Sequence, residues 1–192
     1  MCSWCWGFGN TWKQVQQQAK DKLSIKYVLG GLAPDSDEIM PDKMRNYIQE
    51  NWQKIEQTIP DTQFNYNFWK NCTPTRSTFP ACRAVIAAKN QGNQFEATMI
   101  LAIQHAYYLQ AENPSDPSIL IKLAISIGLD KQQFINDLNS NATQVKLDHD
   151  IALSKSLGAS GFPSLVLVKN GVNQLIQIDY NNPKSILKQI FT

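Results

Sequence analysis

Two cysteines separated by two residues stand near the start of this 192-residue chain, where residues 2–5 read Cys-Ser-Trp-Cys. Thiols at this spacing can close a disulfide with each other and reopen it, and disulfide exchange requires a thiolate. Because a helix N-terminus favours negative charge, a helix starting at this turn would stabilise the thiolate of Cys2. The second thiol, Cys5, would lie one turn further on the same face. The spacing therefore predicts a redox-active dithiol.

A zinc site or a purely structural disulfide is the alternative use of this turn. A four-cysteine zinc site needs a second close pair, but the other two cysteines, Cys72 and Cys82, stand ten positions apart. The two histidines, His105 and His149, fall inside expected helices without the spacing of metal ligands. We therefore expect redox chemistry and no metal.

The pair Cys72 and Cys82 allows two interpretations. Pro74 and Pro80 make the intervening segment irregular, so the two thiols could meet across a loop as a second redox pair. Alternatively they stay reduced and packed, which a reducing compartment favours.

Helices and strands that would hold the dithiol can be placed from hydrophobic periodicity. Residues 11–20 continue the helix that begins at the dithiol, with apolar residues at helical spacing. Residues 24–29 are rich in β-branched and aromatic types and end at a glycine pair, which predicts a buried strand. From about residue 41 to residue 157 the signal is almost wholly helical, apart from a non-periodic stretch at 60–78.

The last part of the chain predicts a hairpin and a helix. Residues 164–169 and 174–178 have strand character, and Asn170-Gly171 between them is a strong hairpin-turn signal. Residues 183–191 predict a closing helix.

Bulk composition excludes several classes of function. The chain is 43% hydrophobic, with a net charge of +2 and no basic stripe, so we expect neither nucleic acid nor a membrane as a partner. Four cysteines are too few for a small secreted disulfide scaffold. We expect a cytoplasmic protein, or a periplasmic one if a segment precedes Met1.

This order of elements resembles a thioredoxin fold with a helical domain inserted after the second strand, as in the DsbA family. Locally the chain is most similar to the FrnE-like disulfide isomerases of that family, in four segments: residues 1–8, 29–32, 80–84 and 161–165. The resemblance implies an α/β thioredoxin-like domain and an all-helical insertion. Their expected bounds are 1–38 with 158–192 for the first, and 39–157 for the second.

The resemblance also implies roles for individual residues. Cys2 would be the attacking cysteine and Cys5 the resolving one. Phe162-Pro163 would form a cis-proline loop facing the dithiol, and would bind substrate together with Ser3 and Trp4. An extended substrate would then pair with the backbone of this loop, as in β-strand addition.

Ser3-Trp4, between the two cysteines, carries no cation. Motifs with a histidine there gain extra stabilisation of the thiolate from its positive charge. We therefore expect a less favoured Cys2 thiolate and a less oxidising couple than in a histidine-containing motif.

A thioredoxin sheet carries a central strand just before the dithiol helix, and only Met1 precedes Cys2 here. We expect the native reading frame to begin upstream. If it does not, the remaining strand edges would favour domain swapping or a homodimer.

These observations predict a thiol–disulfide oxidoreductase or isomerase, acting on protein or small-molecule disulfides. It would need no cofactor, with glutathione considered as a co-substrate. A glutathione-binding transferase or isomerase of the kappa or hydroxychromene-carboxylate type is an alternative, although such proteins commonly have Ser where Cys2 stands. A third hypothesis is a non-catalytic peptide-binding module whose dithiol senses redox state.

Overall fold

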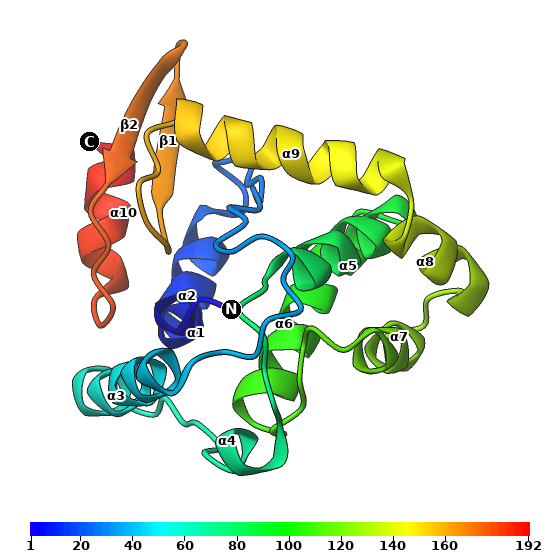
Figure 1. The fold of residues 1–192 in the computed structure, drawn as a ribbon. Helices are drawn as coiled ribbons and strands as arrows, with labels where there is room; N and C mark the ends of the chain where they lie inside the picture. Colours follow the sequence, from blue (N-terminus) through cyan, green and yellow to red (C-terminus); the bar gives the residue numbers. More distant parts are fainter.

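The computed structural model describes all residues from 1 to 192 and combines ten helices with one two-stranded sheet (Figure 1). In chain order the elements are α1 (Ser3–Gly7), α2 (Gly9–Ala19), α3 (Asp42–Thr58), α4 (Phe68–Asn71), α5 (Phe79–Asn90), α6 (Gln94–Tyr108), α7 (Pro117–Ser126), α8 (Lys131–Leu138), α9 (Asn141–Ser156), β1 (Leu165–Lys169), β2 (Val172–Ile176) and α10 (Pro183–Phe191).

The two ends of the chain form one small layer. β1 and β2 pair in antiparallel fashion, with Leu165 opposite Ile176, and α10 packs against both β2 and α2. Figure 1 shows the blue N-terminal helices beside the orange and red C-terminal elements. A small core of buried apolar side chains joins them: Phe8, Val15, Ile176 and Ile186.

The predicted hairpin is confirmed, with a tighter connection than expected. Asn170 and Gly171 both have positive φ, at 53° and 77°, as a two-residue hairpin turn requires. Pairing resumes directly at Val172.

The predicted strand at 24–29 is wrong. This segment has no regular secondary structure and belongs to no sheet, because β1 pairs only with β2. Side chains from other parts of the fold instead form hydrogen bonds with some of its polar groups. The Leu29 N–H donates to the Asp150 carboxylate at 3.2 Å, and the Tyr27 hydroxyl accepts from Trp12 Nε1 and Gln16 Nε2. The composition of the segment favours a strand, but a strand also needs a backbone partner.

The helical part is built around α5, which packs against α6, α7, α8 and α9. Small residues on α5 let its neighbours approach closely; Ala84, Ala87 and Ala88 are buried. Helix boundaries follow the expected signals: the Asp116 side chain caps α7 by accepting from the Ser118 N–H at 2.8 Å. None of the helices combines the length and apolar character needed to cross a bilayer.

A second helical core is aromatic and centres on Trp52 of α3, which is fully buried. Its indole stacks on Phe64 with the ring centroids 4.7 Å apart, and meets Tyr108 of α6 edge-on at 5.8 Å. This cluster extends to Trp4 and Trp6 of α1, so it links the helical part to the dithiol helix.

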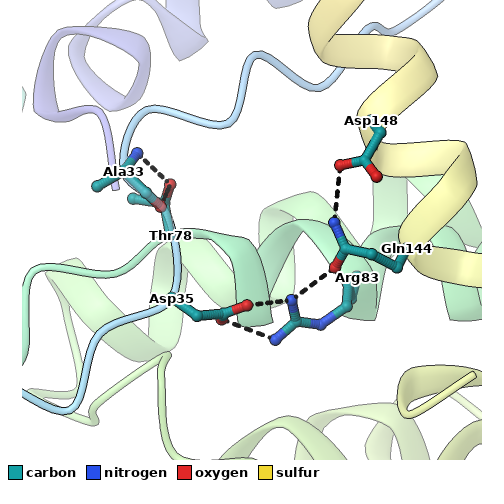
Figure 2. Close-up of polar contacts among 6 residues, drawn as sticks. All are labelled: Ala33, Asp35, Thr78, Arg83, Gln144 and Asp148. Carbon is teal, nitrogen blue, oxygen red and sulfur yellow. Dashed lines mark hydrogen bonds and ion pairs between the residues drawn. The ribbon is translucent and has the colours of Figure 1, made fainter. Parts of the chain in front are cut away.

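Polar contacts hold the segment between Gly31 and α3 against the start of α5, and a further contact joins α5 to α9, as Figure 2 shows. Ala33 and Thr78 exchange two hydrogen bonds through the Thr78 hydroxyl, at 2.9 and 3.0 Å. The Arg83 guanidinium pairs with both carboxylate oxygens of Asp35 at 2.7 and 2.8 Å and also donates to Gln144. This bidentate contact is the geometry in which arginine binds carboxylate best.

Candidate active site

Cys2 is the N-cap residue of α1, with an extended backbone conformation (φ −97°, ψ 109°). Its sulfur accepts a hydrogen bond from the Cys5 N–H at 3.2 Å. The thiol thus occupies the position where a helix start presents free N–H groups, as the spacing predicted.

Phe162 lies directly opposite the dithiol although 160 positions separate it from Cys2. The Cys2 thiol donates to the Phe162 carbonyl, with a sulfur–oxygen distance of 3.3 Å. The Phe162-Pro163 peptide bond is cis. The fold therefore brings together the two ends of the chain that the sequence paired.

Opposite pKa shifts distinguish the two thiols. The pKa of Cys2 is lowered, first by a hydrogen bond from the Cys5 thiol and further by backbone N–H groups, which together outweigh the cost of burying the charge. The pKa of Cys5 is raised well above its usual value, because that thiol supplies the hydrogen bond and is itself buried. Cys2 is the group that ionises first, as an attacking thiol must.

Aromatic rings surround the dithiol. Trp4 packs against Tyr180 with the ring centroids 5.1 Å apart, and Trp6 stacks on Tyr108 at 5.5 Å. Burial, and then the nearby thiols, raise the pKa of Tyr180 to about 12, so its hydroxyl stays neutral at physiological pH. Beside these rings both thiols are only partly exposed.

Ser3, expected to contact substrate, has a partner inside the fold. Its hydroxyl accepts a hydrogen bond from Trp52 Nε1 at 2.9 Å. Because Trp52 is fully buried, this contact satisfies an indole N–H that has no access to water. Ser3 therefore anchors the dithiol turn to α3.

A cavity of about 350 Å³ opens at the dithiol. Its lining includes Cys2, Trp4 and Phe162 on one side, and residues of α3 and of the 74–78 segment on the other. Four of the predicted reactive and substrate-binding residues, Cys2, Ser3, Trp4 and Phe162, thus share one cavity, whereas Cys5 and Pro163 are not among its lining residues.

Residues 1–189 match a family model described as thioredoxin. The chain belongs to this thioredoxin family. Its dithiol and its cis-proline loop therefore lie in a DsbA-like thioredoxin fold with an all-helical insertion.

Solved structures show the same fold. A candidate protein disulfide isomerase from Nitrosomonas europaea is 26% identical, with a TM-score of 0.85 over 98% of this chain and 90% of that one. The cytosolic disulfide reductase DsbM from Pseudomonas aeruginosa is 22% identical, with a TM-score of 0.75 over 92% and 85% of the two chains.

Two curated relatives carry a different name. The ClpXP adapter proteins SpxH of Halalkalibacterium halodurans and Bacillus subtilis are 24% and 23% identical over 99% and 86% of this chain. The matches cover 63% and 54% of those proteins.

The other two cysteines of this thioredoxin-family chain have separate surroundings. Cys72, at the end of α4, donates to the Ala111 carbonyl at 3.3 Å. Cys82 lies in the first turn of α5, where burial raises the pKa of its thiol to about 11. Both are free thiols, as are Cys2 and Cys5. No set of three or more His, Cys, Asp or Glu side chains is arranged to hold a metal.

Sequence reasoning missed the far wall of the cavity. Met44, Tyr47 and Ile48 of α3 line it, together with Arg76. Tyr47 is 60% exposed, which only the structure shows, so the helical pattern of α3 did not by itself indicate this wall. Arg76 lies in the stretch without periodicity, so nothing in the sequence placed it beside the dithiol.

Proposed function

We propose that this protein is a thiol–disulfide oxidoreductase that acts on protein or peptide disulfides through Cys2 and Cys5. One observation carries the proposal: the Cys2 sulfur, held by the Cys5 N–H, lies 3.3 Å from the Phe162 carbonyl at the mouth of an open cavity. The named functions of the two similar solved structures, a disulfide isomerase and a disulfide reductase, support the same class.

In the reducing direction, the Cys2 thiolate attacks one sulfur of a substrate disulfide. The substrate S–S bond breaks, a Cys2–substrate disulfide forms, and the released thiolate takes up a proton. Cys5 then loses its proton and attacks Cys2, forming the Cys2–Cys5 disulfide and releasing the second substrate thiol. Two electrons pass from the protein dithiol to the substrate, so repeated turnover requires an external dithiol as reductant.

Phe162 and Pro163 would hold the substrate during this exchange. The Phe162 carbonyl faces Cys2 and can accept a hydrogen bond from the backbone N–H of an extended substrate segment. Trp4 offers an apolar surface beside the reacting sulfur.

Trapping of the mixed disulfide tests this role. The reduced protein is mixed with a peptide disulfide, and the products are separated under non-reducing conditions. Cys5→Ser should accumulate a covalent adduct with half of the peptide disulfide, Cys2→Ser should form none, and Cys72→Ser should behave as wild type. An adduct in Cys2→Ser, or equal reactivity of all three variants, would refute the assignment.

The names of the curated relatives favour a second candidate, a protein-binding adapter role without turnover. Here the cavity would bind a polypeptide and the dithiol would sense redox state. Two results together would favour this adapter role. A disulfide-free peptide would bind equally tightly to wild type and to Cys2→Ser, and wild type would reduce no disulfide. Conjugation of glutathione to an electrophile would instead favour the kappa-type alternative.

We further place the protein in a reducing compartment, as the name of the cytosolic reductase DsbM suggests for that relative.

A further inference from the structure

Arg76 supplies the one charged side chain, apart from an ionised Cys2, among the residues that line the cavity at the dithiol. Its side chain is exposed and takes part in no ion pair or hydrogen bond. Arg83, a cation on α5, is by contrast neutralised by Asp35. The cavity therefore holds a positive charge that the protein leaves unpaired.

The cavity also has separate apolar and polar parts. Leu32, Met44 and Tyr47 form an apolar wall, and Leu32 and Tyr47 remain 52% and 60% exposed. Near Arg76, the Ser77 hydroxyl is buried without a hydrogen-bond partner, which is an uncommon state for a buried polar atom. An occupant that buries apolar groups against this wall and brings a negatively charged acceptor to Arg76 would match both parts.

We propose that the cavity selects disulfide-bearing polypeptide segments that carry an acidic residue close to the reactive cysteine, and that Arg76 binds this carboxylate. The inference rests on the proposed function and names its substrate class. A polypeptide fits better than a small thiol for two reasons. The Phe162 carbonyl offers backbone pairing to an extended chain, and the cavity lining combines apolar side chains with the cation.

The charge of the whole protein would not produce this preference. The net charge is only +2, and the lining contains no acidic side chain to oppose a carboxylate. Selectivity would therefore come from Arg76 locally, and one partly exposed ion pair is worth about fivefold in rate or affinity.

A pair of matched peptide disulfides tests the inference. The two peptides differ only in Glu or Gln two positions from the cysteine, and single-turnover reduction by the dithiol is followed through tryptophan fluorescence. Wild type should reduce the Glu peptide about fivefold faster than the Gln peptide at low salt, and the ratio should shrink at high salt. Arg76→Ala should bring the ratio close to one, Arg76→Glu should invert it, and Arg76→Lys should keep most of it.

Lys131→Ala is the control, since Lys131 is an exposed and unpaired cation on α8, outside the cavity. It should keep both rates and their ratio. Three results would overturn the inference and leave the proposed function standing. They are equal rates for the two peptides in wild type, a preference that survives Arg76→Ala, and faster reduction of glutathione disulfide than of the acidic peptide. Failure to reduce any disulfide would instead remove the proposed function itself.

Discussion

The ring of Phe162 fills the space beside Gly30, so closely that a Cβ added to Gly30 would lie 1.9 Å from Phe162 Cζ. This contact joins the segment after α2 to the cis-proline loop. Because the carbonyl of the same Phe162 faces Cys2, the packing at Gly30 sets the position of the loop relative to the dithiol.

Gly30→Ala should therefore damage the site through Phe162. The added methyl group must displace the ring, because no L side chain fits at 1.9 Å, and overpacking of this kind costs about 1–3 kcal/mol. We expect the rate of disulfide reduction to fall by more than the loss of stability explains. Single-turnover kinetics measures the rate, and urea unfolding measures the free energy of unfolding. Gly161→Ala is the matched control, because a Cβ at Gly161 meets nothing within 4 Å. Equal losses in both variants would contradict the role of this contact.

The lowered pKa of Cys2 should depend on the Cys5 side chain. The largest cause of the shift is the hydrogen bond from the Cys5 thiol, so Cys5→Ala should raise the pKa of Cys2, whereas Cys5→Ser keeps a donor and should raise it less. A thiolate forms as pH rises through the pKa, so the pH profile of Cys2 alkylation should move to higher pH in Cys5→Ala. Identical profiles for both variants would show that the backbone N–H groups alone set the pKa.

Ser3 should contribute to stability through Trp52 more than to catalysis. Ser3→Ala removes the acceptor of a fully buried indole N–H, which costs about 1–3 kcal/mol. In a Trp52→Phe background the N–H is absent, so the additional cost of Ser3→Ala should be much smaller. Urea unfolding of the four proteins measures this coupling. Additive losses would mean that the hydrogen bond is not the reason for the effect of Ser3.

Much of the fold was predictable because the signals were local. The helix starts at Cys2 and Asp116 and the turn at Asn170-Gly171 follow from capping and turn chemistry within a few residues. The strand expected at 24–29 failed for the opposite reason, since strand formation depends on a distant partner that composition does not reveal.

The residues of the candidate site were likewise predictable only in part. Cys2 and Phe162 could be paired from the sequence because a known family arrangement connects them across the whole chain. Arg76 and the α3 wall could not, because they reach the cavity through the packing of irregular segments, in which no residue spacing indicates a neighbour. The anchoring of Ser3 by Trp52 is likewise a contact between residues 49 positions apart.

The four thiols should differ in reactivity in the order that their environments dictate. Burial raises the pKa of Cys82 to about 11, and burial followed by the charge of Glu112 raises that of Cys72, whereas the pKa of Cys2 is lowered. At neutral pH, iodoacetamide should therefore modify Cys2 first in the reduced native protein, with Cys82 becoming reactive only as the pH approaches its raised pKa or on denaturation. Peptide mapping after timed alkylation measures this order, and early modification of Cys82 would contradict it. The intact mass after mild oxidation should correspond to one disulfide, because Cys72 and Cys82 have separate partners; a second would restore the pair considered from the sequence.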